Sequence, residues 1–415
     1  MIETVLFEES NTRSRFLAAP CLKEREQYLH HLMRRGYGPR YLRTVSFYMV
    51  RVIQLLPLTA LRTVEPEEIE RAALAWAAYR GPDRRGVKTC NTTVLFSRVA
   101  KNWLLFHNRL ALPAAPVHPY ESEIADFTNS LRSIGAVSPA TIDAYRWRVK
   151  LVLSWLAANG LVLSSVTLND MDQCFEAKLA QGWSLSTLAS HCQALRAFFL
   201  HAEGHGWCPP GLARGIRKPV VPKYDGVSRG PTWGDVRRLL RRESKMSTTF
   251  ALRAHAMLLL YSIYALRSSE VSDLRLIDID WREETFCVKR AKRGGYQRYP
   301  LQYEVGEAIL RYLKVRPRCS CRNVFVTLQQ PYRRVSSGGM HSIVKRRFKA
   351  LGIRSRNCGP HALRHACAAH LLKMEAPLKD IADFLGHRDT KLVGIYAKLD
   401  TRSLRKVAAF SLKGL

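Results

Sequence analysis

The chain has 415 residues, of which 47% are hydrophobic and 24% charged, so it can build several packed domains and is not disordered by composition. Its 66 basic and 34 acidic residues give a formal charge of +32, which predicts a polyanionic partner, with nucleic acid the first candidate. No apolar run approaches the ~18 residues of a membrane-spanning helix. The start of the chain also lacks the basic-then-apolar order of a secretory signal, so we expect a cytoplasmic protein without membrane contact.

Proline and glycine residues divide the first half of the chain into a tail over residues 1–20, a block over 21–112 and a block over 116–212. The two blocks share apolar positions at helical spacing, in PRYLRTVSFYMVRVIQLL from Pro39 and in PATIDAYRWRVKLVLSWL from Pro139. We expect two bundles of about four helices each, related by duplication or alike by chance. The paired positions are Leu42 with Ile142, Phe47 with Trp147, Val52 with Val152, Ile53 with Leu153, and Leu56 with Leu156.

A basic, proline-containing stretch follows over residues 213–231 and predicts an exposed linker that lies along a polyanion. The third block covers residues 232–415. It opens with a helix for which Thr232 is the predicted N-cap, and an apolar helix follows over about residues 253–266.

Further along this block, strand-like stretches over residues 285–288 and 296–301 flank Gly294-Gly295 and predict a β-hairpin. Residues 323–327 predict a third strand, and the pattern is helical again from Met340. The expected fold is therefore mainly α, with two N-terminal helical bundles and a small antiparallel β-sheet in the C-terminal domain.

Ten cysteines are scattered along the chain, mostly in apolar, helix-like stretches, which favours reduced thiols in the core. The one tight cluster is Cys319-Ser-Cys321, with Cys358 and His361 further on. Its spacing is not that of a usual zinc module. We therefore expect no metal and no cofactor, and a zinc site built from these residues is the alternative.

Four segments of the third block carry reactive or charged residues. They are Ala265-Leu266-Arg267-Ser268-Ser269-Glu270, Lys292 at the hairpin turn, His361-Ala362-Leu363-Arg364-His365, and Leu385-Gly386-His387 followed by Tyr396. Each has an ordinary explanation alone, such as a solvated arginine, a capping pair, a helix end or a core tyrosine. All of them in one order would require a coincidence at several independent positions.

In this order the segments resemble the tyrosine recombinase family, the phage integrase-like recombinases. The family's pattern is an arginine in Gly/Ala-Leu-Arg-x-x-Glu, a hairpin lysine, His-x-Leu-Arg-His, Leu-Gly-His, and a tyrosine shortly after it. The resemblance is strong over about residues 232–399 and looser over 117–210, where the family has a helical core-binding domain. It implies an integrase or transposase of a mobile element, which cuts and rejoins DNA through a 3′-phosphotyrosyl intermediate and a Holliday junction.

Carried over to matching positions, the resemblance makes Tyr396 the nucleophile, has Arg267 and Arg364 clamp the scissile phosphate, and has His361 and His387 hydrogen-bond it. The chemistry suits these residue types. Guanidinium groups stay ionised and grip two oxygens at once. Two of them with two imidazoles supply the charge stabilisation that other enzymes obtain from metal ions. A phenol, with a pKa of about 10, needs such cations and a base to become a nucleophile.

The leaving 5′ oxygen must gain a proton, and the resemblance assigns this role to Lys292, with Lys289 and Arg293 as nearby rivals. Glu270 and His365 are implied to support the arginines and the fold of the pocket. The expected partners are a double-stranded recombination site, further copies of the chain in a synaptic tetramer, and sister recombinases.

Two features depart from the family's usual plan. The block over residues 21–112 adds a second core-binding-like bundle, which could widen the DNA footprint, contact inverted repeats or join subunits. The tail after Tyr396 has apolar residues at helical spacing and is predicted to pack on a neighbouring subunit, or else on its own domain. The rival functions are a type IB topoisomerase-like nicking enzyme and a non-catalytic architectural or regulatory DNA-binding protein.

Overall fold

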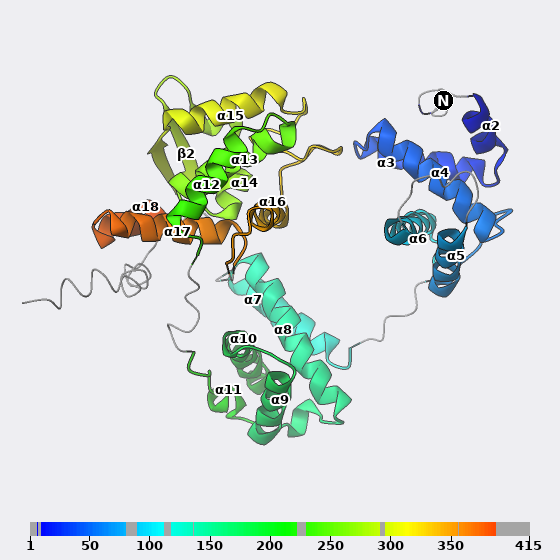
Figure 1. Ribbon diagram of the computed structural model, residues 1–415. Coiled ribbons are helices and arrows are strands. Elements are labelled where there is room, and N and C mark those ends of the chain that lie inside the picture. Colours follow the sequence, from blue (N-terminus) through cyan, green and yellow to red (C-terminus); the bar gives the residue numbers. More distant parts are fainter. Residues whose placement is uncertain are drawn as a thin grey trace, which may run out of the picture. The chain divides into compact units, whose positions relative to one another are not determined.

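The structure is a computed structural model of the chain (Figure 1). It describes Leu6 and residues 10–79, 89–111, 118–135, 137–221, 230–290, 295–355 and 357–386. Two compact units are present, one formed by residues 112–226 and the other by residues 1–111 with 227–415. Among the described residues, no helix combines the length and the hydropathy that crossing a membrane requires.

The N-terminal bundle contains α2 (Ser10–Ala18), α3 (Leu22–Arg34), α4 (Pro39–Leu55), α5 (Pro66–Ala78) and α6 (Thr89–Phe106). Residues 1–20 were predicted to be a tail, but α2 packs on α3 and α4 and buries Phe16 in the core. The buried Arg25 fastens this helix, because it donates to the carbonyl oxygens of Phe16 at 2.6 Å and Pro20 at 2.9 Å. The Phe16 carbonyl belongs to the last turn of α2 and Pro20 follows the helix, so the cation also complements the helix dipole.

The second bundle contains α7 (Glu121–Ile134), α8 (Pro139–Ala158), α9 (Leu168–Ala180), α10 (Leu185–Gly204) and the short α11 (Leu212–Gly215). Side chains of Ser138, Thr167 and Ser184 cap the amino ends of α8, α9 and α10 by accepting from backbone N–H groups three residues on. Ala213 and Ile216, which fell in the predicted linker, are buried in this core. The exposed part of the linker therefore begins after Ile216.

The two bundles agree at the positions paired from the sequence. Leu42, Val52, Ile53 and Leu56 are buried, and so are their counterparts Ile142, Val152, Leu153 and Leu156. The remaining pair is exposed in both bundles, with 40% of Phe47 and 61% of Trp147 accessible. Burial thus follows the same pattern along α4 and α8, although a common origin stays a prediction.

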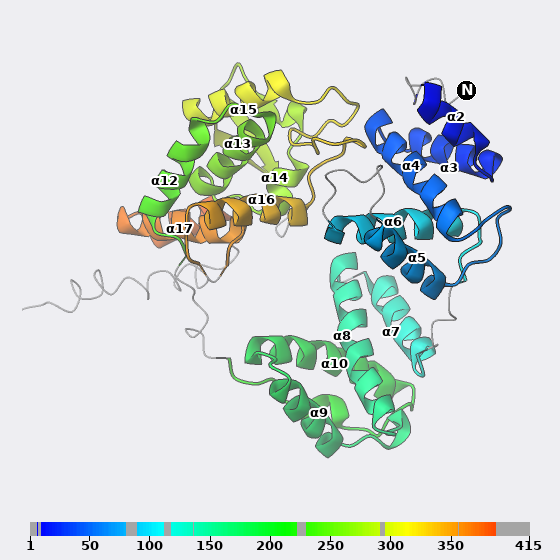
Figure 2. The same cartoon turned by 45° about the vertical axis from the view of Figure 1, so that its right-hand side comes forward.

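The C-terminal domain surrounds the long apolar helix α13 (Thr249–Ile263), which packs on its neighbours α12, α15 and α17 (Figure 2). Its elements in chain order are α12 (Trp233–Ser244), α13, α14 (Ser268–Asp273), β1 (Ile279–Asp280), β2 (Thr285–Lys289), β3 (Tyr296–Pro300), α15 (Tyr303–Val315), α16 (Ser337–Ala350), α17 (Pro360–Lys373) and α18 (Leu378–Leu385). The predicted cap is confirmed, because Thr232 Oγ1 accepts from the Asp235 backbone N–H at 3.1 Å. The apolar helix ends at Ile263 rather than Leu266, because the backbone turns at Ala265, whose φ is +50°.

The small sheet has the order β1-β2-β3 and is antiparallel throughout, with Phe286 opposite Tyr299. The predicted hairpin is confirmed, although Gly294 lies outside the described residues. The third strand was predicted wrongly. Residues 323–327 form only isolated bridges, and the third strand is Ile279–Asp280. Three consecutive residues of that stretch, 324–326, are fully buried, so its apolar character reflects core packing rather than strand alternation.

A buried ion pair joins α12 to α16, and its removal tests how these two helices are held together. Arg347 Nε lies 2.6 Å from Glu243 Oε2, and both side chains are less than a tenth exposed. We expect Arg347→Met to lower the free energy of unfolding of the C-terminal domain by about 3–5 kcal/mol, because the Glu243 carboxylate stays buried without its cation. Urea unfolding followed by circular dichroism measures this loss.

The matched control is Arg346→Met, on the exposed face of the same helix, for which we expect a change within about 0.5 kcal/mol. Replacing both partners, in Glu243→Met with Arg347→Met, should recover most of the loss, because no lone charge remains. Equal stability of Arg347→Met and wild type would show that the pair does not hold these helices together.

Candidate active site

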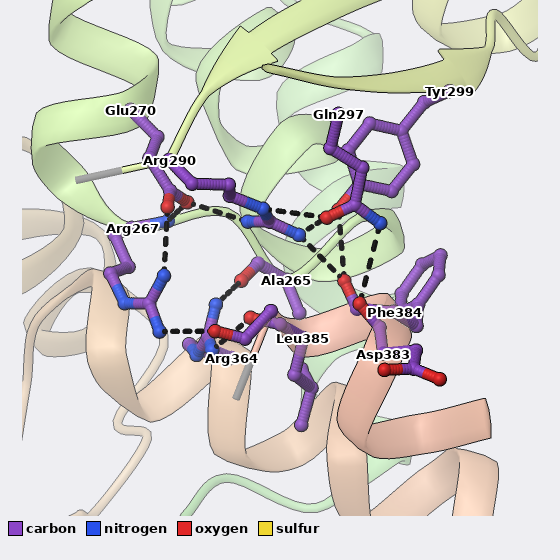
Figure 3. Close-up of polar contacts among 11 residues, drawn as sticks. Ala265, Arg267, Glu270, Arg290, Gln297, Tyr299, Arg364, Asp383, Phe384 and Leu385 are labelled. Atoms are coloured by element: carbon purple, nitrogen blue, oxygen red, sulfur yellow. Dashed lines mark hydrogen bonds and ion pairs between the residues drawn. The ribbon is translucent and has the colours of Figure 1, made fainter. Parts of the chain in front are cut away.

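The carboxyl end of α18 is held by side chains from the hairpin (Figure 3). A helix leaves the carbonyl groups of its last turn without intrahelical partners. Here Gln297 Nε2 donates to the Asp383 carbonyl at 3.3 Å, and Arg290 Nη2 and the Tyr299 hydroxyl each donate to the Phe384 carbonyl at 2.8 Å. Burial raises the pKa of Tyr299 to about 12, so its hydroxyl stays protonated and remains a donor.

The next two carbonyls of this end are held by predicted site residues (Figure 3). Arg364 Nη2, from α17, donates to the Leu385 carbonyl at 2.6 Å, and Arg267 Nη2 donates to the Gly386 carbonyl at 3.3 Å. Arg364 Nη1 also donates to the carbonyl of Ala265 at 2.5 Å, in the turn between α13 and α14. The two arginines of the sequence pattern are therefore brought to one helix end, 97 residues apart in sequence.

Gly386 lets the Arg290 guanidinium pack closely against the carboxyl end of α18. It caps α18 with a φ of +63°, in the left-handed region that favours glycine. A Cβ at this position would lie 2.8 Å from Arg290 Nε, so a side chain would displace the guanidinium. The Leu-Gly-His segment thus needs its glycine for both backbone conformation and space.

Glu270 lies at the centre of the cluster and is buried. It accepts from the Arg267 backbone N–H and from Arg267 Nη1, each at 2.8 Å, and from Arg290 Nη1 at 3.0 Å. Burial alone raises the pKa of this carboxyl, but the Arg267 N–H and the two guanidinium groups outweigh it and leave the pKa below its usual value. Glu270 therefore stays ionised and fixes the positions of Arg267 and Arg290.

Two imidazoles stand on α17 beside Arg364. The rings of His361 and His365, one helical turn apart, have centroids separated by 4.3 Å and meet edge to face. Burial, followed by the neighbouring His361 and Arg364, lowers the pKa of His365 to about 4. A neutral His365 can hydrogen-bond an anionic ligand only through the nitrogen that carries its proton.

The structure brings together five of the eight predicted site residues, namely Arg267, Glu270, His361, Arg364 and His365. The other three, Lys292, His387 and Tyr396, lie outside the described residues, as do Arg293 and the tail after Tyr396. The cluster has three guanidinium groups against one carboxylate, so its charge favours an anion.

Arg290, which stands between Lys289 and Lys292, was not predicted from the sequence. A signal was present, because side chains alternate along a strand and Phe286, Val288 and Arg290 share the inward face of the hairpin. Gln297 and Tyr299 were also missed. They carry no charge, and only the tertiary contacts with α18 give them a role.

The alternative zinc site is not formed. Among the described residues, the metal-ligating side chains that gather in one place are Asp126, His201 and His205, in the second bundle. Cys321 Sγ instead lies 3.5 Å from Asn323 Oδ1, and Cys358 Sγ lies 3.1 Å from the Ser355 carbonyl oxygen.

Residues 234–402 match the phage integrase family, and residues 124–204 match the phage integrase N-terminal SAM-like domain. The putative integrase/recombinase y4gC of Sinorhizobium fredii is 42% identical over 40% of this chain and 86% of that protein. The putative integrase/recombinase y4rA of the same organism is 34% identical over 69% of this chain and 70% of that protein. In fold, the chain resembles the XerH site-specific recombinase bound to its difH substrate, with 16% identity, a TM-score of 0.53, and coverage of 84% of this chain and 98% of that chain.

Arg290 offers a test of how the cluster is held. In Arg290→Met, the buried Glu270 loses one cation and the partly buried Phe384 carbonyl loses one donor. We expect the C-terminal domain to lose about 3–5 kcal/mol of its free energy of unfolding, measured by urea titration. The matched control is Arg298→Met on the exposed face of β3, where we expect a change within about 0.5 kcal/mol. A similar small change in both variants would contradict the assigned role.

The lowered pKa of His365 predicts that the stability of the folded protein depends on pH. This pKa is about 4 in the folded protein, against about 6.5 in an unfolded chain. Between these values the unfolded chain binds the proton more readily, so stability rises with pH across this window and is lost as pH falls from about 6.5 to about 4. Thermal melts of wild type and His365→Asn at half-unit steps should show a steeper loss in wild type. Parallel curves would count against a half-buried His365 that stays neutral.

Proposed function

Because the chain belongs to the phage integrase family of tyrosine recombinases and is a site-specific DNA recombinase, we propose that the cluster at the end of α18 is the phosphate-binding part of its active site. The single observation that carries this proposal is the convergence of Arg267 and Arg364 on the carbonyl end of one helix. DNA presents a phosphodiester, whose transition state gathers negative charge on the non-bridging oxygens.

The two arginines differ in exposure, and this supports different tasks. The side chain of Arg267 is 19% exposed, so phosphate oxygens can reach its guanidinium. Arg364 is only 2% exposed and is bound to two backbone carbonyls. In our proposal Arg267 makes the more accessible contact with the scissile phosphate, and Arg364 supplies a fixed positive charge behind it.

Glu270 and Arg290 act as positioning residues in this scheme. Glu270 holds the Arg267 guanidinium from one side, and Arg290 holds Glu270 and the Phe384 carbonyl from the other. Neither needs to touch the DNA. The negative charge of Glu270 and the positive charge of Arg290 cancel. The net positive charge that attracts phosphate therefore comes from Arg267 and Arg364.

The reaction then needs the residues that follow in the sequence. The hydroxyl oxygen of Tyr396 gives its proton to a base and attacks the phosphorus, the bond to the 5′ oxygen breaks, and a 3′-phosphotyrosyl ester forms. Lys292 gives a proton to the leaving 5′ oxygen, and His361 and His387 hydrogen-bond the non-bridging oxygens. A 5′ hydroxyl from the partner strand reverses the step, so no external energy source is required. Gly386 supports this scheme, since its carbonyl is held by Arg267 and His387 is the next residue.

We further propose that four protomers exchange strands through a Holliday junction on two double-stranded sites, as part of a mobile element. The names of the relatives, putative integrase/recombinases, support the recombination part of this proposal. The tail after Tyr396 joins neighbouring subunits in this scheme. The N-terminal bundle adds contacts with DNA or between subunits, which fits the formal charge of +32.

The nucleophile can be identified by trapping. Wild-type protein incubated without metal or ATP with end-labelled DNA from the element's termini, nicked near the suspected cut, should give a slow protein–DNA band on a denaturing gel. We expect Tyr396→Phe to reduce this band at least about 100-fold, because no phosphotyrosyl ester can form. The matched control is Tyr303→Phe, since Tyr303 is 79% exposed in the same domain, and it should retain the band.

A band that persists in Tyr396→Phe would assign the nucleophile elsewhere. If wild type binds the DNA but forms no band, the chain would be a binding protein rather than a strand-exchange enzyme. Relaxation of supercoiled plasmid without recombinant products would instead favour the topoisomerase-like activity.

A further inference from the structure

Three metal-ligating side chains meet in the second bundle, within the unit formed by residues 112–226, which contains none of the residues assigned to catalysis. Asp126 stands on α7, His201 lies in the last turn of α10, and His205 caps that helix. Asp126 Oδ2 lies 2.9 Å from His201 Nε2 and 3.8 Å from His205 Nε2. One ligand atom from each residue lies within 4.8 Å of the others.

The spacing suits a single ion. Two ligand atoms that are each about 2.0–2.2 Å from a zinc ion lie about 3.3 Å apart at tetrahedral angles. The two distances to Asp126 fall on either side of that value, so small side-chain rotations would bring them to it. Two histidines four residues apart on a helix present their rings on one face, which is the usual way for a helix to offer two ligands.

The orientation of one ring is already fixed. His205 Nδ1 lies 2.9 Å from the carbonyl oxygen of His201 and can donate to it. That hydrogen bond assigns the proton to Nδ1 and leaves the lone pair of Nε2 directed toward Asp126. Metal-binding histidines in proteins are commonly oriented by this kind of contact with a backbone carbonyl.

Aromatic rings enclose the site on two sides. The His201 ring lies 5.7 Å from Phe127 and 5.5 Å from Trp207, and the His205 ring lies 4.8 Å from Trp207, all between centroids. Asp126 and His205 keep about half of their side-chain surface exposed, so an ion can enter from solvent.

We propose that Asp126, His201 and His205 bind one divalent transition metal ion, with zinc as the first candidate. Two neutral imidazoles and a carboxylate are a donor set that such ions accept, and three protein ligands leave one position for water. The ion links α7 to the end of α10, through Asp126 and His201, which are 75 residues apart in sequence. It therefore stabilises the bundle.

The test measures metal binding by the full-length chain. Protein stripped with a chelator is dialysed against zinc, and bound metal is counted by mass spectrometry. We expect wild type to retain one equivalent more than His205→Gln and Asp126→Asn. Because cysteines also bind zinc, the Cys319→Ser/Cys321→Ser variant serves as a matched control and should keep the additional equivalent.

A spectroscopic measurement locates the ion. Cobalt and nickel ions quench the fluorescence of nearby tryptophan, whereas zinc does not. Trp207 should therefore be quenched in wild type, and Trp207→Phe should lose that part of the quenching. The His205 side chain is exposed enough for His205→Gln to leave the fold intact. This variant should need at least about tenfold more metal for the same quenching.

Zinc should also raise the melting temperature of wild type but not of Asp126→Asn. Equal metal content and equal quenching in wild type, His205→Gln and Asp126→Asn would overturn the proposal. The three residues would then form an ion-paired cluster without a metal.

Discussion

The carbonyl groups at the end of α18 impose the constraint on which the C-terminal domain depends. A helix that ends inside a protein must have these acceptors satisfied, and here the donors are three arginines, a glutamine and a tyrosine. Cations at this end also complement the helix dipole. The same contacts tie the turn before α14, the hairpin and α17 to one point. Two of the residues that organise this end of the helix, Arg267 and Arg364, are therefore the ones that we propose to attract a phosphate.

This arrangement places charge where hydrophobic packing would be more stabilising. Buried ion pairs gain little net stability, because desolvation offsets most of the attraction. Glu270 is tolerated because several donors surround it, and each buried guanidinium has carbonyl or carboxylate acceptors. The buried polar centre thus adds little to the free energy of unfolding, but it fixes the position of Arg267 without requiring DNA to be present. In the proposed function, the phosphate of DNA then meets a preorganised site.

The two helical bundles show how one pattern can carry different chemistry. Helix α4, with its C-cap residue Leu56, and helix α8 bury the same four of the five paired positions. At the remaining position each exposes an aromatic residue, Phe47 or Trp147. The end of α10 carries His201 and His205 against Asp126. The end of α6 carries His107 instead, whose Nε2 lies 3.0 Å from the carbonyl oxygen of Glu24. Core positions define the bundle, whereas residues at helix ends are free to differ.

The sequence by itself determined what depends on neighbours along the chain. The Thr232 cap and the hairpin rest on contacts within a few residues, so residue type and spacing were sufficient to predict them. The support of Arg267 by Glu270 was implied instead by the resemblance to the family. The third strand was predicted wrongly, because an apolar run does not distinguish a strand from a buried loop. Tertiary structure alone decided that Arg290 holds Phe384, and that Asp126 meets His201. These contacts join residues 94 and 75 positions apart, and only the packing of whole elements brings them within hydrogen-bonding distance.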